Sequence, residues 1–329
     1  MTPLHSASFY GKPEIVQLLD HGAEANAEGD NGENPLHKVS CGEYEPQEGR
    51  VRVAQLLLER GVDINARCKD HCTPLFLASY CGKLEIVRLL LDHGAEVSAE
   101  TNNGDNPLHA VTYGRQKSQE DGVRVARLLL ERGVNVNARR NDHCTPLLLA
   151  SYHGKLEIVR LLLDHGAEAD VEADNGENPL HKVLCGKHDP REDGVRVARL
   201  LLERGVDVNV QRNDNRTPLH IASYYGNLET ARLLLDYGAK VDAVDDWGGT
   251  PLHDVSQGPY DSEEAGVGVA RQLLDHGADV NAKARFGRTP LALLSCRKRP
   301  KLAELLEHAA TVNRRRSRAS SSRADYFKW

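Results

Sequence analysis

The fold is decided by the stretch Thr217-Pro218-Leu219-His220-Ile221-Ala222-Ser223-Tyr224-Tyr225-Gly226, which continues as Asn227-Leu228-Glu229-Thr230-Ala231-Arg232-Leu233-Leu234-Leu235-Asp236-Tyr237-Gly238-Ala239. Thr217 is a predicted helix N-cap, because its hydroxyl can accept a hydrogen bond from an unpaired backbone N–H. Pro218 stands at the first helical position, where its missing donor costs nothing. Gly226 ends this helix, and Gly238 ends a second helix in a position that suits positive φ. The stretch therefore predicts a helix–turn–helix hairpin.

One such hairpin has more apolar surface than it can bury, because residues 228–235 are apolar around most of the predicted second helix. The hairpin therefore needs neighbours of its own kind. The same opening recurs at eight other places, which are Thr2, Asn34, Thr73, Asn106, Thr145, Asn178, Thr250 and Thr289.

A Thr-Pro-Leu-His-x-Ala pattern that recurs about every 33 residues resembles the ankyrin-repeat family. The resemblance covers residues 1–312 and implies an all-α ankyrin-repeat solenoid of about nine helix–turn–helix units with finger loops between them. In such a solenoid each unit contacts mainly its neighbours. Residues 313–329 are rich in Arg and Ser, and we expect them to form a basic, disordered tail.

Composition limits the function classes. The net charge is −6, and the last 17 residues hold six basic groups against one acid, so the repeats are acidic. An acidic body argues against nucleic acid as the partner, since that binding depends on cationic contacts to phosphate. Seven cysteines, no signal peptide and no membrane-length apolar run indicate a reducing compartment, the cytosol or the nucleus, and no membrane partner. We expect a monomer.

The units alternate in length. Their openings lie 32, 39, 33, 39, 33, 39, 33 and 39 residues apart, so every second unit carries about six extra residues after its first helix. These residues are predicted to enlarge the loop between the two helices, either as neutral padding or as a second contact edge. Residues 71–96 and 143–168 differ at only two places, which indicates that a double unit was copied as a block. The enlarged stretches are Glu43–Arg50, Arg115–Gly122, Lys187–Gly194 and Pro259–Gly266.

The loops between units alternate in charge. Either adjacent loops attract one another, or the stripes form a face that selects a partner by electrostatic complementarity. The acidic loops carry Glu28, Asp30 and Glu33; Glu100 and Asp105; Glu172, Asp174 and Glu177; and Asp245 and Asp246. The basic loops carry Arg67 and Lys69; Arg139 and Arg140; Arg212 and Arg216; and Lys283, Arg285 and Arg288.

The resemblance implies that the end of the first helix and the finger loops face a concave groove where partners bind. Aromatic residues recur at the end of the first helix in the short units, and Tyr and Trp are favoured interface anchors. The alternative is that each Tyr packs on the next layer. The candidate contacts at helix ends are Phe9, Tyr10, Tyr80, Tyr152, His153, Tyr224 and Tyr225. Those from the fingers are Lys69, Asp70, Asn141, Asp142, Asp214, Arg216, Asp246 and Trp247.

Catalytic and metal readings find little support. Most of the fifteen histidines stand at motif positions to which the resemblance gives a structural role, or near the C-terminus of a second helix. Cys68, His71 and Cys72 lack the spacing of a zinc site, and no phosphate loop or nucleophile elbow is present. We therefore predict no catalytic residues, no metal, no cofactor and no enzymatic activity. The resemblance also gives a turn-stabilising role, with hydroxylation in some members, to Asn65, Asn137, Asn209 and Asn281.

The sequence thus predicts a non-enzymatic scaffold or adaptor that binds a partner protein. One alternative is a nuclear regulator that masks a transcription factor and is imported through its basic C-terminal tail, since two basic clusters (297–301 and 314–318) resemble a bipartite import signal. Another is the sensing end of a larger signalling or ubiquitin-ligase protein.

Overall fold

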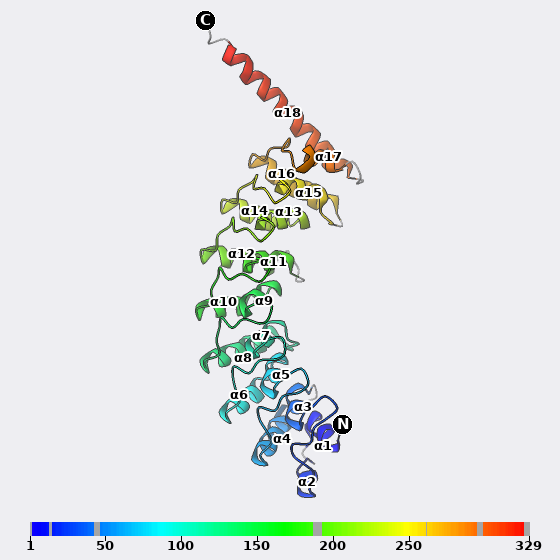
Figure 1. Ribbon diagram of the computed structural model, residues 1–329, viewed down its shortest axis with the longest axis vertical. Coiled ribbons are helices and arrows are strands. Elements are labelled where there is room, and N and C mark those ends of the chain that lie inside the picture. Colours follow the sequence, from blue (N-terminus) through cyan, green and yellow to red (C-terminus); the bar gives the residue numbers. More distant parts are fainter. Residues whose placement is uncertain are drawn as a thin grey trace. The chain divides into compact units, whose positions relative to one another are not determined.

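A computed structural model of the chain describes residues 2–12, 15–42, 47–186, 193–260, 262–294 and 299–325 (Figure 1). The chain divides into two compact blocks of several repeats each. From here on we call these blocks unit 1 (Met1–Asp174) and unit 2 (Asn175–Trp329), call each single hairpin a repeat, and describe the two blocks separately. Within the described ranges, all regular secondary structure is helical and there is no strand. The all-α prediction is therefore confirmed.

Unit 1 contains five helix hairpins in two layers. The first helices pack on one another in order (α1 on α3, α3 on α5, α5 on α7, α7 on α9), and so do the second helices from α4 to α10. The hairpins are α1 (Pro3–Phe9) with α2 (Ile15–Asp20), α3 (Pro35–Cys41) with α4 (Gln47–Glu59), α5 (Pro74–Tyr80) with α6 (Leu84–Asp92), α7 (Pro107–Tyr113) with α8 (Gln119–Glu131), and α9 (Pro146–Tyr152) with α10 (Leu156–Asp164).

Unit 2 repeats this arrangement in the described part of its four hairpins. Helices α11, α13, α15 and α17 form one layer, and α12, α14, α16 and α18 form the other. The hairpins are α11 (Pro179–Cys185) with α12 (Asp193–Glu203), α13 (Pro218–Tyr225) with α14 (Leu228–Asp236), α15 (Pro251–Gln257) with α16 (Glu263–Asp275), and α17 (Pro290–Leu293) with α18 (Pro300–Asp325); a short 3₁₀ turn, η1 (Arg285–Gly287), precedes α17.

A buried histidine joins the start of most first helices to the next repeat. In α7, the Asn106 backbone N–H donates to His109 Nδ1 at 3.2 Å, so Nε2 carries the proton and donates to Cys144 O at 3.3 Å. In α11, His181 Nε2 lies 3.2 Å from Arg216 O. Both imidazoles are fully buried, so a neutral ring satisfies one donor and one acceptor that would otherwise lie unpaired.

Two internal repeats replace this histidine with an apolar residue, and the last repeat has Ala292 at the same position. Phe76 and Leu148 stand at the same position of α5 and α9, and both are buried. Leu148 packs against Val171 and Ala173 of the following loop. At these junctions hydrophobic contact takes the place of the histidine bridge.

The asparagines after the second helices also link successive repeats. Asn137 Oδ1 accepts from Glu168 N at 2.9 Å, and its Nδ2 donates to Gly166 O at 3.1 Å. Asn209 does the same with Lys240 N and Gly238 O. The side chain therefore holds the turn of the following repeat, in addition to standing in a turn of its own.

The extra residues of the long repeats are not all loop. Helices α8 and α16 have 13 residues, whereas α6, α10 and α14 have 9. In α8, Ser118 caps the helix by accepting from Asp121 N at 3.1 Å, so residues 119–122 form an added first turn. Residues 43–46 and 187–192 of the other enlarged stretches lie outside the described part of the chain.

Helix α18 extends to Asp325 and so covers most of the segment that the sequence predicts to be disordered. Its first turns pack on α16 through buried Leu302 and Leu306. Beyond them the sequence holds Ala and Arg, which are good helix formers, and neither Gly nor Pro before residue 325. The domain boundary at residue 312 stays a prediction.

The buried histidines make stability depend on pH. Burial lowers the pKa of His109 and of His181 to about 4, so the unfolded chain binds more protons than the folded chain between pH 4 and 6.5. The free energy of unfolding should therefore fall on acidification, by roughly 1–2 kcal/mol per histidine between pH 7 and pH 5. Urea unfolding at both pH values measures the change.

A pair of variants isolates this effect. His109→Gln keeps a donor to the Cys144 carbonyl but cannot titrate, so its urea midpoint should fall less on acidification than that of His71→Gln, whose histidine is exposed. Other titrating groups contribute equally to both variants. Equal pH dependence in the two variants would show that His109 does not titrate as described.

Candidate functional site

The loops that connect one hairpin to the next, which we call the fingers, are held side by side by backbone hydrogen bonds. In each case the donor is the N–H of the residue five before the first helix that follows the finger, and the acceptor is the carbonyl of the residue four before the first helix of the preceding repeat. In unit 1 these bonds are Lys69 N to Asn31 O (2.8 Å), Asn102 N to Asp70 O (3.1 Å), Asn141 N to Asn103 O (2.9 Å) and Asp174 N to Asp142 O (3.4 Å). In unit 2 they are Asn213 N to Asn175 O (3.3 Å), Asp246 N to Asp214 O (3.2 Å) and Arg285 N to Trp247 O (2.7 Å).

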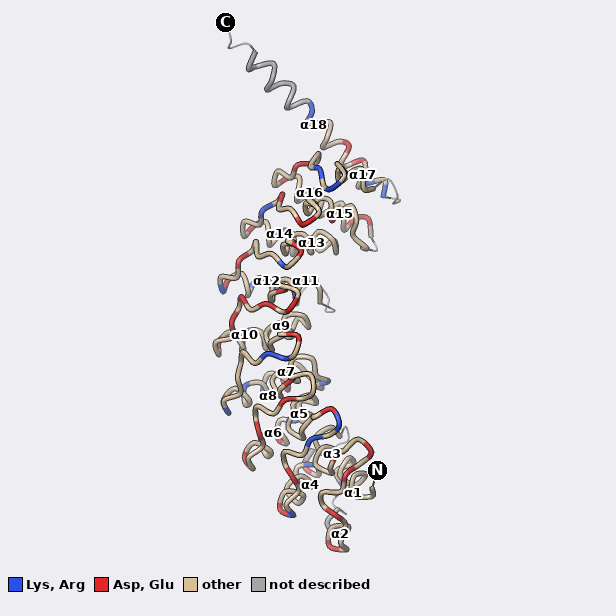
Figure 2. Tube along the Cα trace, viewed as in Figure 1, with Lys and Arg blue, Asp and Glu red and all other residues tan. Residues whose placement is uncertain are grey.

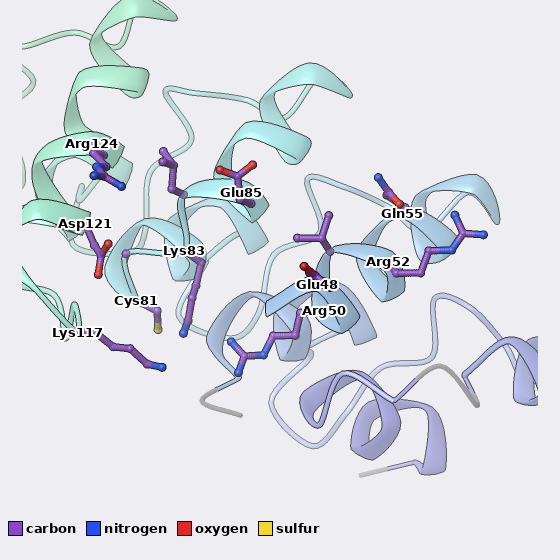
Figure 3. A pocket seen from close by; sticks show the side chains of 13 residues that line it. Glu48, Arg50, Arg52, Gln55, Cys81, Lys83, Glu85, Lys117, Asp121 and Arg124 are labelled. Atoms are coloured by element: carbon purple, nitrogen blue, oxygen red, sulfur yellow. The ribbon is translucent and has the colours of Figure 1, made fainter. Parts of the chain in front are cut away.

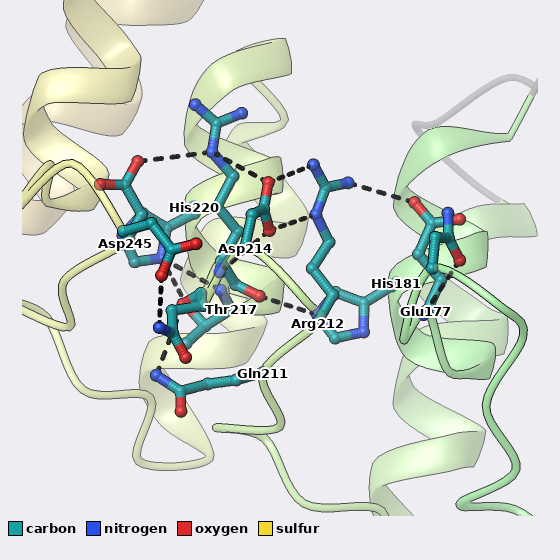
Figure 4. Close-up of polar contacts among 12 residues, drawn as sticks. Glu177, His181, Gln211, Arg212, Asp214, Thr217, His220 and Asp245 are labelled. Carbon is teal, nitrogen blue, oxygen red and sulfur yellow. Dashed lines mark hydrogen bonds and ion pairs between the residues drawn. The ribbon is translucent and has the colours of Figure 1, made fainter.

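Acidic and basic fingers alternate within each unit (Figure 2). In unit 2, Arg212 donates to Glu177 of the preceding acidic finger at 3.2 Å and makes a two-pronged contact with Asp214 of its own finger, at 2.7 Å on both bonds (Figure 4). Lys182 of α11 donates to the other oxygen of Glu177 at 2.6 Å. The attraction expected between adjacent fingers is therefore present.

The ion-pair network continues toward α15. Arg216 Nη2 donates to Asp254 Oδ1 at 3.2 Å, and its Nε lies 3.6 Å from Asp245 Oδ2. Burial raises the pKa of Asp254 to about 7, although the Arg216 charge acts in the opposite direction. The hydrogen bonds from Arg212 hold the pKa of Asp214 below its usual value. Asp214 and Arg216, both candidate contacts from the sequence, therefore hold the fingers together.

Unit 1 has a smaller version of the same network. Arg140 donates to Asp142 of its own finger at 2.9 Å, and it lies 3.6 Å from Asp105 of the preceding finger. Burial raises the pKa of the Tyr113 phenol in α7, and the charge of nearby Asp105 acts in the same direction. Among the other candidates from the sequence, Asn141 donates from Nδ2 to Asn102 O at 2.9 Å, and Lys69 and Asp70 are exposed at their finger.

The aromatic candidates are divided between packing and exposure. Tyr80 is half-buried and its ring lies 5.9 Å from that of Tyr113 in the next repeat, so packing on the next layer describes it well. Tyr152 is also half-buried and lies edge-on to His153, at 5.1 Å. Phe9 and Tyr10 form a similar pair at 5.3 Å, in which the Tyr10 side chain is exposed.

In unit 2 the aromatic candidates lie near the fingers. Tyr224 and Tyr225 are perpendicular neighbours at 5.2 Å, and the guanidinium of Arg216 lies 5.8 Å from the Tyr224 ring. Tyr225 is exposed, as is Asp246, which accepts from Asn215 Nδ2 at 2.6 Å. The structure therefore brings Arg216 and the two tyrosines together.

Trp247 occupies a finger tip and is 50% exposed. The next tip carries Phe286, which is 85% exposed and which the sequence reading missed. Trp247 stands three residues before the capping Thr250, and Phe286 stands three residues before the capping Thr289. The two aromatic residues therefore occupy equivalent positions, which can be recognised from the sequence alone. Phe286 also has φ +63°, a left-handed conformation that costs a bulky residue roughly 1–2 kcal/mol.

A cavity of about 790 Å³ lies in unit 1 on the edge that carries the enlarged loops (Figure 3). It forms at the short repeat of α5 and α6, where the longer second helices α4 and α8 project on either side. Figure 3 shows the end of the Lys83 side chain beside the Cys81 thiol, and Arg50 and Lys117 line the same cavity. Glu48, Glu85 and Asp121 also line the cavity, so its walls carry charges of both signs.

The described part of the chain holds no group of three His, Cys, Asp or Glu side chains placed to bind a metal ion. Cys68 and Cys72 lie at the base of one finger, and burial raises the pKa of the Cys72 thiol to about 12, which disfavours the metal-binding thiolate. In the same ranges, no helix has the length and apolar character needed to cross a bilayer.

The finger network should contribute more to stability than exposed ion pairs do. Arg212→Ala removes a partner from Glu177, which is nearly buried, and both bonds to Asp214, so we expect it to lower the free energy of unfolding by about 1–3 kcal/mol. Arg196→Ala is the matched control, because Arg196 pairs with Asp193 at 3.9 Å on an exposed helix face and should cost less than about 1 kcal/mol. Urea unfolding of the two full-length variants compares them, and equal losses would contradict the role given to Arg212.

Models of known families match this chain along most of its length. The description "Ankyrin repeats (3 copies)" matches residues 47–140 and 116–211, "Ankyrin repeats (many copies)" matches residues 201–253, and "Ankyrin repeat" matches residues 1–30 and 247–285.

Two known proteins are similar to parts of this chain. The crystal structure of the human ASB11 ankyrin repeat domain is similar with a TM-score of 0.61 at 27% identity, over 71% of this chain and 98% of that one. The neurogenic locus Notch protein of Drosophila melanogaster is 36% identical over 80 residues, which are 24% of this chain and 3% of that protein. Because the three-copy description alone covers half of the residues and the others extend it toward both ends, this chain belongs to the ankyrin-repeat family.

Proposed function

We propose that this chain is a non-enzymatic scaffold that binds a partner protein through its fingers and the ends of its first helices. Ankyrin repeats in general mediate protein–protein interactions. The observation that carries the proposal is the backbone ladder between fingers, because it fixes the loops without using the side chains at their tips. A surface ordered before binding loses little conformational entropy when a partner arrives.

The exposed side chains suit protein recognition. Tyr10, Tyr225 and Trp247 offer large, rigid contact areas, and such residues are frequent interface anchors. Lys69, Asp70 and Asp246 supply exposed charges of both signs, which favour a partner whose own surface charges match them. The half-buried Tyr80 and Tyr152 would act mainly by shaping the surface under the contact.

A pull-down with matched variants tests the proposal. The finger variant combines Tyr10→Ala, Lys69→Glu and Tyr225→Ala, all at exposed positions. The control combines Arg88→Ala, Arg160→Ala and Arg232→Ala, which are exposed on the second helices α6, α10 and α14. We expect proteins captured by the full-length chain from a lysate of the source organism to fall at least tenfold with the finger variant and to remain with the control.

Circular dichroism melting curves verify that both variants are folded. If folded finger variants retain the wild-type set of partners, while the second-helix variant loses it, the binding surface is on the opposite face and the proposal is wrong. Loss in neither variant would also reject the fingers and the first-helix ends as the main contact.

A further inference from the structure

The last two fingers differ from the others at their tips. The position three residues before the helix cap holds Asn31, Asp70, Asn103, Asp142, Asn175 and Asp214 in six fingers, and Trp247 and Phe286 in the last two. The Arg285 N–H donates to Trp247 O at 2.7 Å, so the two aromatic tips are neighbours. Two exposed aromatic residues therefore stand on adjacent finger tips, where the other fingers are polar.

The Phe286 tip is also shaped differently from the rest. In the other fingers only the residue two before the cap has positive φ, and it is Gly, His or Asn, residues that tolerate this conformation. In the last finger both Phe286 (φ +63°) and Gly287 (φ +70°) adopt it. The strain presents an aromatic ring to solvent without gaining burial for it, which points to use of the ring in binding.

The last finger carries three cations and no acid between residues 281 and 289, namely Lys283, Arg285 and Arg288. All three are exposed, and none forms an ion pair with a residue in the described ranges. Arg288 stands in the register of Arg216, which is half-buried and paired with Asp245 and Asp254. The charges that elsewhere bind adjacent fingers are therefore available here, and the guanidinium of Arg285 lies 5.3 Å from the Phe286 ring.

We propose that these two tips bind an acidic peptide segment of a partner protein that carries a bulky apolar side chain. The apolar side chain would insert beside Trp247 and Phe286, and the carboxylates would pair with Lys283, Arg285 and Arg288. The inference rests on the proposed protein-binding function and specifies the chemistry of one partner segment. Single-stranded nucleic acid also combines stacking with cations, but it needs a basic groove that follows its backbone, whereas three cations beside the exposed acid Asp246 match the few carboxylates of a peptide.

A random library of 12-residue peptides, selected on the full-length chain, tests the proposal. Each round is counter-selected on the Trp247→Ser/Phe286→Ser variant, so that peptides bound elsewhere are removed. We expect the retained peptides to have a net charge of about −3 or lower with at least one bulky apolar residue. A retained peptide, labelled and followed by fluorescence anisotropy, should bind at least tenfold more weakly to Arg285→Glu/Arg288→Glu.

The matched charge control is Arg199→Glu/Arg271→Glu, which makes the same charge change on exposed positions of α12 and α16. It should change the affinity less than threefold. Raising NaCl from 50 to 300 mM should weaken binding to the wild type, since exposed charges are screened over this range. Selection of neutral or basic peptides, or equal losses in both charge variants, would overturn the proposal.

An oligo(dT) 12-mer is measured in parallel. If it binds and is lost with Trp247→Ser/Phe286→Ser while no acidic peptide is selected, the tips are a nucleic-acid site and the proposal is wrong. The pull-down variants at residues 10, 69 and 225 leave both tips intact. A failed peptide selection together with a successful pull-down therefore rejects this inference alone.

Phe286→Gly gives a further prediction. Glycine adopts φ +63° without steric cost, so we expect the thermal midpoint to stay the same or rise, while the affinity for the selected peptide falls at least fivefold. A fall in the thermal midpoint with unchanged affinity would show that the ring serves the fold.

Discussion

Most junctions between repeats depend on one recurring interaction, the buried imidazole that joins the cap of one repeat to the loop of the next. A neutral His109 or His181 accepts from a backbone N–H in its own repeat and donates to a carbonyl 35 residues further along the chain. Each hairpin is too short to hide its apolar faces, so it is stable only when the neighbouring repeat covers it. The hydrogen bonds of the imidazole fix the distance and the angle between adjacent repeats, which hydrophobic contact alone does not.

The fingers separate the groups that hold the structure from those that face solvent. Backbone amides and carbonyls form the ladder, and pairs such as Arg212 with Glu177 and Asp214 secure the loop bases. The tips then tolerate side chains as different as Asp214 and Trp247, because neither is needed for the ladder. Recognition can change at a tip without loss of the fold.

The sequence predicts the repeats well because their signals are local. Caps such as Asn106, the proline after them and the glycines at helix ends each act within a few residues. Contacts between repeats are harder to predict: the pairing of Tyr80 with Tyr113 depends on the distance between layers, so the sequence left open whether Tyr80 packs on the next layer or faces a partner. The sequence shows that Phe286 shares the register of Trp247, but the exposure of Phe286 depends on a left-handed backbone that a bulky residue rarely adopts, so the sequence did not predict it. The added helical turn at residues 119–122 begins at the N-cap Ser118, which is a local signal. The six extra residues were instead predicted to lie in a loop, because they were interpreted together as one insertion.

The alternation of finger charge imposes a parity on the chain. Arg140 reaches back to Asp105, Arg212 reaches back to Glu177, and Arg216 reaches forward to Asp245, so these two basic fingers each rely on an acidic neighbour. Removing or inserting one repeat would set like charges beside each other, whereas a change of two repeats preserves every pairing. Gain or loss of two repeats is therefore the change that this design accommodates, and the near-identity of residues 71–96 and 143–168, two repeats apart, fits such a step.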